Sequence, residues 1–163
     1  MQTVRLTSDE VESLYQKHGA SLAAYACAYG LDHASAEDVV HQLFLKILGE
    51  KVFVPQSPLA YLYRATRNSS LNLRRDRQRE TELHDTDVWF IHPGGSHDEV
   101  LTLQKALQEL PEEQRETVFL KVWSGMTLAE IAELTETPLN TVASRYRYAL
   151  RKLRGRLGQY SKR

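Results

Sequence analysis

Apolar residues recur at intervals of three and four along most of the chain, which is the spacing of an amphipathic α-helix. The stretch from Thr7 to Glu10 has the pattern of a capping box, so we expect a first helix to begin there and to end at Gly30. A second helix is predicted from near Ser35 to Gly49. The positions expected to face the core are Val11, Leu14, Tyr15, Leu22, Tyr25 and Tyr29 in the first helix, and Val40, Leu43, Phe44 and Ile47 in the second.

A third long helix is predicted after Ser57-Pro58, because a serine caps well and a proline suits the first helical position. This helix would complete a first lobe, residues 1–80, in which residues 50–56 form a loop with a short apolar patch. Residues 81–96 show no sustained periodicity of apolar residues and contain Pro93-Gly94-Gly95, so we expect an acidic, flexible linker there.

The second lobe, residues 97–163, is also predicted to be helical. A capping-box pattern at Ser96 to Glu99 would open one helix, and Pro111 would start the next, which Gly125 would end. The apolar positions of these two helices are Val100, Leu103, Leu107, Leu110, Val118, Phe119, Val122 and Trp123. Because no strand pattern is longer than a few residues, we expect an all-α fold of two small helical domains joined by a flexible linker.

Residues 127–157 predict a helix-turn-helix. A capping box from Thr127 to Glu130 would open a short helix, and the residues from Thr135 to Thr137 would make a tight connection. Thr137 would then cap a longer helix with Pro138 at its first position. The expected buried stripe of that helix is Leu139, Val142, Tyr146, Leu150, Leu153 and Leu157.

The net charge is zero, but the charges are segregated along the chain. Residues 64–79 carry six arginines and one acid, residues 80–99 carry six acids and no lysine or arginine, and residues 138–163 carry eight bases and no acid. Two basic blocks separated by acidic stretches favour two polyanion contacts on one chain. The simpler alternative is that each basic block is only a solvent-exposed helix face with no polyanion partner.

The outward face of the last helix combines short hydrogen-bonding side chains with arginines, the types that read base edges in a major groove. An ordinary amphipathic helix with a basic face would not explain the absence of any acid. We therefore expect DNA contact through Asn140, Thr141, Ser144, Arg145, Arg147, Tyr148, Arg151, Lys152 and Arg154. Of these, Arg151, Lys152 and Arg154 suit phosphates, which position a helix without specifying sequence.

Several function classes are disfavoured. The six histidines are scattered without a metal-binding pair, and neither a phosphate-binding glycine loop nor a nucleophile motif occurs, so we expect no catalytic site, cofactor or metal. A metal held in the linker by His84, Asp85, Asp87, His92 and His97 is a weak alternative. The single cysteine, Cys27, cannot form an internal disulfide, and no apolar run is long enough for a membrane span. A soluble, cytoplasmic protein is expected.

Several motifs resemble those of a known family. Residues 109–118 (ELPEEQRETV), 126–133 (MTLAEIAE) and 140–145 (NTVASR) resemble region 4 of bacterial sigma factors. Residues 36–46 (AEDVVHQLFLK) resemble the region-two helix that docks on core RNA polymerase, and residues 58–75 (PLAYLYRATRNSSLNLRR) resemble the helix that meets the minus-ten element. The resemblance covers nearly the whole chain and is strongest to the extracytoplasmic-function (ECF) group of the sigma-70 family.

The resemblance implies promoter-specific initiation by core RNA polymerase, with double-stranded DNA read at the minus-thirty-five element and an opened strand at the minus-ten element. It also implies an anti-sigma factor or another regulator as a partner, and a loop at residues 50–56 that receives a flipped base. The region-two DNA contacts would be Tyr61, Arg64, Arg67, Asn68, Arg74 and Arg75. The polymerase contacts would be Glu37, Asp38, His41, Gln42 and Phe44.

The chain departs from the family pattern in a few places. His41 and Gln42 stand where glutamine and glutamate are usual, and Asn140 occupies a typical glycine position. Two other functions stay open: a stand-alone helix-turn-helix regulator that never joins polymerase, and a pure protein-interaction module. The docking-type motif argues against the first, and the basic faces argue against the second.

Overall fold

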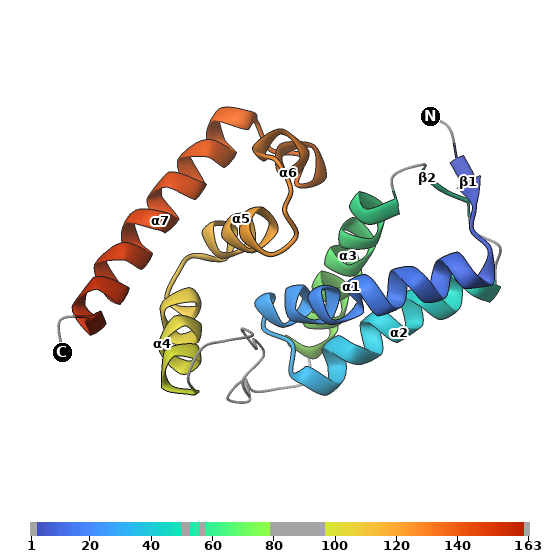
Figure 1. Ribbon diagram of the computed structural model, residues 1–163, viewed down its shortest axis with the longest axis horizontal. Coiled ribbons are helices and arrows are strands. Elements are labelled where there is room, and N and C mark those ends of the chain that lie inside the picture. Colours follow the sequence, from blue (N-terminus) through green and yellow to red (C-terminus); the bar gives the residue numbers. More distant parts are fainter. Residues whose placement is uncertain (1–2, 50–52, 56–57, 79–96, 162–163) are drawn as a thin grey trace. The chain divides into compact units, whose positions relative to one another are not determined.

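The computed structural model describes residues 3–49, 53–55, 58–78 and 97–161, and within these ranges the chain is almost entirely helical (Figure 1). The chain divides into two units, residues 1–87 and 88–163. The predicted all-α class with two helical domains is confirmed. The predicted linker, residues 81–96, lies outside the described residues.

The first unit consists of α1 (Ser8–Ala28), α2 (His33–Gly49) and α3 (Pro58–Gln78), which pack on one another. The capping box at the start of α1 is present: the Thr7 N–H donates to Glu10 Oε2 at 2.7 Å, and the Glu10 N–H donates to Thr7 Oγ1 at 3.3 Å. The Thr7 N–H and the Thr7 hydroxyl both donate to the Glu10 carboxylate, which lowers the pKa of Glu10. Gly30 follows the helix with φ of 86°, a conformation in which glycine is favoured.

Tyrosines form the centre of the first core. Tyr25 meets Tyr29 and Tyr63 edge-on, with ring centroids 5.4 and 5.3 Å apart, and all three rings are buried. Burial raises the pKa of Tyr63 to about 12 despite an opposing hydrogen bond with Ser21. Tyr63 is therefore a packing residue of α3, beside the fully buried Leu62.

A small two-stranded ribbon was not anticipated. Strands β1 (Thr3–Arg5) and β2 (Phe53–Pro55) pair antiparallel, with Val4 opposite Val54 and Arg5 opposite Phe53. Part of the expected loop at residues 50–56 is thus a strand. Three-residue strands are too short to show the alternation that identifies a strand in sequence, and their pairing joins distant segments.

The second unit consists of α4 (His97–Gln108), α5 (Glu112–Val122), α6 (Leu128–Leu134) and α7 (Leu139–Ser161). The long helix α7 contacts each of the other three. Fully buried side chains of this core are Leu107, Val118, Phe119, Leu120, Ile131 and Val142. Ser96, the predicted cap of α4, lies outside the described residues.

Two apolar residues of this unit are not where the periodicity placed them. Leu139, assigned to the buried stripe of α7, is 50% exposed, and Val122 at the end of α5 is 54% exposed. Both stand at helix ends, where the neighbouring helices no longer cover the stripe. Further along α7, the fully buried position is Ala149, whereas Tyr146 and Leu150 are half-buried.

Candidate nucleic-acid and polymerase interfaces

The connection between α6 and α7 is held by backbone hydrogen bonds. The Thr137 N–H donates to the Ala132 carbonyl at 2.9 Å, and the Glu136 N–H donates to the Glu133 carbonyl at 3.4 Å. This pair of bonds is the Schellman pattern, with Glu136 in the left-handed position at φ of 51°. The α6 capping box between Thr127 and Glu130 is also present, so both ends of the short helix are fixed.

The first turn of α7 begins one residue later than predicted. The Pro138 carbonyl accepts from the N–H groups of Thr141 and Val142 at 3.0 and 3.1 Å, so the helix starts at Leu139. The Thr137 hydroxyl, expected to cap α7, donates to the Thr135 carbonyl at 3.1 Å. The Thr137 hydroxyl hydrogen is therefore bonded within the turn. The turn sets the direction of α7 relative to α6.

The residues predicted to contact duplex DNA lie on the uncovered side of α7. The opposite side is buried through Val142, Ala149 and Leu153. Of the nine predicted residues, Ser144 and Arg145 are half-buried. The exposed ones are Asn140, Thr141, Arg147, Tyr148, Arg151, Lys152 and Arg154. Nothing in their placement conflicts with DNA contact, which stays a prediction.

Tyr148 is the aromatic centre of this face. The residue is 46% exposed, and the guanidinium carbons of Arg147 and Arg151 lie 5.5 and 5.6 Å from the ring centroid. Cation–π attraction of this kind holds flexible arginine side chains near a flat ring. The two cations are therefore presented to solvent around one aromatic side chain.

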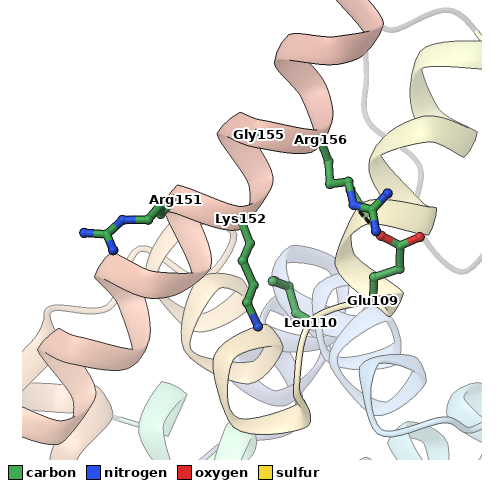
Figure 2. A pocket seen from close by; sticks show the side chains of 7 residues that line it. Glu109, Leu110, Arg151, Lys152, Gly155 and Arg156 are labelled. Atoms are coloured by element: carbon green, nitrogen blue, oxygen red, sulfur yellow. Dashed lines mark ion pairs between the residues drawn. The ribbon is translucent and has the colours of Figure 1, made fainter.

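A hollow of about 510 Å³ lies beside the later part of α7, against the end of α4 and the turn that follows it (Figure 2). Arg156 crosses part of this hollow to pair with Glu109 at 2.9 Å. In Figure 2, Lys152 extends toward Leu110, whereas Arg151 points away from the hollow. Arg151 and Lys152 both border the hollow, but their side chains point in different directions, and Arg156 is paired with a carboxylate.

The arginines of α3 divide into two groups. Arg67 Nε donates to the Tyr29 hydroxyl at 3.0 Å, and Arg74 Nη1 donates to the Tyr29 carbonyl at 3.3 Å. The Arg74 guanidinium also lies 5.9 Å from the Tyr29 ring centroid. Both arginines, predicted as DNA contacts, are half-buried and bind α3 to the end of α1. This structural role was not apparent from the sequence.

Arg77 makes a further contact of this type. Its guanidinium donates to Asp32 Oδ1 at 2.9 Å and to Ser35 Oγ at 2.6 Å, which joins the end of α3 to the turn before α2. Hydrogen bonds from Ser35, and then from Arg77, lower the pKa of Asp32 to about 2. The remaining predicted DNA residues of α3 are Arg64, Asn68 and Arg75, which are exposed, and Tyr61, which is half-buried.

The predicted polymerase-docking face of α2 is mostly accessible. Glu37, Asp38, His41 and Gln42 are exposed, but Phe44 is only 5% exposed and its ring packs edge-on against Tyr15 at 5.2 Å. Phe44 therefore cannot present its ring to a partner in this arrangement. It belongs to the core because it lies on the same side of α2 as Val40 and Ile47.

Tyr15 joins this face from α1. It was predicted to be buried, yet it is 38% exposed, with its hydroxyl 2.5 Å from His41 Nε2 and its ring stacked on the imidazole at 5.6 Å. Sequence reasoning also missed Leu45 and Leu48, which are 59% and 47% exposed on α2. The sequence did contain a signal for these exposed leucines, because α2 carries more apolar residues than one buried stripe needs.

Among the helices that the structure describes, none combines the length and apolar character needed to cross a bilayer.

Comparison with known proteins places these features in one family. Residues 14–80 match the family profile for sigma-70 region 2, and residues 101–153 match the profile for sigma-70 region 4. The ECF RNA polymerase sigma factor SigL of Mycobacterium tuberculosis is 30% identical over 156 residues, covering 88% of this chain and 86% of SigL. EcfG of Rhodopseudomonas palustris is 32% identical over 141 residues, covering 82% of this chain and 77% of EcfG.

A solved structure is also similar. It is the sigma factor RpoE of Bartonella quintana in complex with the anti-sigma factor NepR, with a TM-score of 0.75 and 29% identity over 93% of this chain and 98% of that one. The two sigma-70 regions occur in the same order as the two helical units, and the relatives align over most of their length. The chain therefore belongs to the extracytoplasmic-function group of the sigma-70 family of RNA polymerase sigma factors.

Proposed function

We propose that this sigma factor binds core RNA polymerase through the exposed face of α2 and directs it to promoters. The helix-turn-helix unit reads the minus-thirty-five element as a duplex, and α3 contacts the minus-ten element as its strands open. The polymerase supplies the chemistry. The protein then acts in the cytoplasm, where polymerase and promoter DNA are found.

The uncovered face of α7 is the observation that carries this proposal. It presents hydrogen-bonding residues in its first two turns, including Asn140, Thr141 and Ser144, and cations throughout. Residues near the start of a recognition helix reach base edges, and cations further along meet the backbone. Residues 138–163 contain no acid to oppose phosphate.

The opened strand would be met by residues of α3 whose side chains reach the surface. Arg64 supplies positive charge, Asn68 can hydrogen-bond to a base edge, and Tyr61 offers a ring for stacking. We assign Arg67 and Arg74 to support of the α1–α3 packing instead, because they already contact Tyr29. Arg77 is assigned to the contact of α3 with the turn before α2, because it contacts Asp32.

The polymerase contact combines charge with apolar surface. Glu37, Asp38 and Gln42 provide polar groups, while Leu45 and Leu48 provide exposed apolar area on the same helix. Interfaces usually place apolar anchors within a polar rim, and this face has both. An anti-sigma factor is a second proposed partner, since the similar sigma factor of Bartonella quintana is bound to one.

Transcription in vitro tests the proposal. Core polymerase with this protein should produce defined transcripts from a pool of genomic fragments, whereas core alone should not. The protein alone should bind the recovered promoters weakly. A strong, sequence-specific footprint without polymerase, together with no transcript in its presence, would favour a stand-alone regulator.

A further inference from the structure

Leu139 is an apolar side chain at the first position of the recognition helix. It is 50% exposed, although the periodicity of α7 predicts that it should be buried. The two residues that follow, Asn140 and Thr141, are exposed and polar. The end of α7 that faces solvent therefore offers one apolar group beside two hydrogen-bonding ones.

The backbone on either side of Leu139 is fixed. Before it, the Schellman bonds from Glu136 and Thr137 close the turn, and the ring of Pro138 restricts φ. After it, the Pro138 carbonyl accepts from Thr141 and Val142. The backbone of Leu139 is thus held in place before any partner arrives, which reduces the entropy lost when the residue makes a contact.

The geometry points to a specific role: we propose that Leu139 contacts the C5-methyl group of a thymine in the minus-thirty-five element. This inference rests on the proposed function of α7. Thymine is the base that presents a methyl group in the major groove, and apolar side chains recognise it by contact. A leucine has no hydrogen-bonding group, so it can distinguish thymine from cytosine only in this way.

The first turn of α7 would then combine two kinds of contact with DNA. Asn140 and Thr141 hydrogen-bond to base edges or phosphates, and Leu139 adds a preference for thymine at a single base pair. Val122 provides a matched control, because it is another exposed apolar residue of the same unit, at the end of α5. It lies outside the helix-turn-helix, and it is given no role in DNA reading.

The test uses holoenzyme formed with the full chain and a promoter fragment recovered by transcription from genomic DNA. Each thymine of the minus-thirty-five element is replaced in turn by deoxyuridine, which removes the methyl group alone. At one thymine, the replacement should weaken wild-type binding about fourfold, the value expected for one buried methyl group. Leu139→Ala should weaken binding to the thymine promoter by a similar factor and abolish the deoxyuridine effect at that position only.

Val122→Ala should keep the wild-type response at every thymine. If Leu139→Ala also keeps that response, or if no deoxyuridine replacement matters, the inference is overturned. The Arg145→Ala variant distinguishes failure of this inference from failure of the proposed function. Whether or not Leu139 contacts a thymine, Arg145→Ala should reduce the preference of the holoenzyme for the promoter over a scrambled minus-thirty-five element. Wild-type holoenzyme that shows no such preference would overturn both. Circular dichroism of Leu139→Ala should match wild type, because half of the side chain is already in solvent.

Discussion

At the scale of single residues, side chains of the same charge differ in burial and in their contacts. The arginines of α3 illustrate this, because some of them pack against α1 and others face solvent. Arg67 and Arg74 are half-buried and reach Tyr29, whereas Arg75 is exposed. Composition identified a basic block, but only the contacts show which of its members are used within the fold.

The two ends of the recognition helix should differ in sequence preference. Arg145→Ala should cost about 1–3 kcal/mol of binding free energy on the correct minus-thirty-five element and much less on scrambled DNA. Arg154 lies nine residues, about 13 Å, further along the axis, so Arg154→Ala should weaken binding to both DNAs equally and lower the salt slope by about one at most. Holoenzyme binding to both DNAs across a salt series measures this. Uniform losses from both variants would contradict the assigned orientation of α7.

The Asp32 carboxylate should make stability depend on pH in the acid range. Its folded pKa of about 2 lies below the ordinary value of 3.8, so its contribution is complete above about pH 4 and is lost as the pH falls through about 2. The side chain is 46% exposed, which limits the contribution to less than about 1 kcal/mol. Urea titrations of wild type and Asp32→Asn should show a difference near neutral pH that vanishes near pH 2. A difference that is constant with pH would contradict this assignment.

Two buried threonines should respond oppositely to removal of the hydroxyl group. Thr66 Oγ1 in α3 is buried and lacks a hydrogen-bond partner among the described residues, whereas Thr117 Oγ1 in α5 donates to the Glu113 carbonyl at 2.7 Å. Thr66→Val should therefore leave α3 as stable as before or stabilise it by about 1 kcal/mol, and Thr117→Val should destabilise α5 by about 1 kcal/mol. Hydrogen exchange of each helix reports the two effects separately. Equal destabilisation in both cases would indicate that Thr66 has a partner.

At the scale of elements, the caps and turns set where helices begin and end. Both predicted capping boxes that fall within the described residues, at Thr7 and Thr127, are present, because each depends on residues three apart in sequence. The α6–α7 turn is different: it places Glu136 in a conformation usually taken by glycine. No feature of the local sequence predicts this left-handed conformation.

The turn at Glu136 should tolerate glycine better than a branched residue. At φ of 51° a side chain is strained by about 1 kcal/mol, so Glu136→Gly should preserve the turn and stabilise the unit by up to about 1 kcal/mol. Glu136→Val should destabilise it, because β-branching worsens the clash. Thermal unfolding of both variants measures the two shifts. Stabilisation by valine would show that the turn is not left-handed in solution.

At the scale of the whole molecule, the chain consists of two helical units. The exposed face of α2 belongs to the first unit, and the recognition helix belongs to the second. If the two units act on polymerase and DNA as proposed, each can be impaired without unfolding the other.

A charge reversal on α2 should therefore weaken polymerase binding selectively. Asp38→Arg places a cation on the proposed docking face, and Asp9→Arg makes the same change at an exposed position of α1. Size exclusion with core polymerase should show reduced co-elution for Asp38→Arg and wild-type co-elution for Asp9→Arg. Circular dichroism should match wild type for both. Normal co-elution of a folded Asp38→Arg protein would remove this residue from the docking face.

The sequence alone determined the helices, the helix-turn-helix and the family. These depend on periodicity, on capping residues a few positions apart and on motifs within continuous stretches, all of which are local properties. The burial of Leu62, Ile131 and Val142 follows from the same local patterns.

The tertiary structure decided which side chains are free to act. Leu139 and Leu45 are exposed because the neighbouring helices do not reach them, and Phe44 is withdrawn from the α2 face because it packs against Tyr15. The pairing of β1 with β2, and the contact of Arg77 with Asp32, join segments far apart in the chain. Such contacts depend on how whole helices pack, and packing depends on the complete set of neighbours around each residue rather than on the residues beside it in sequence.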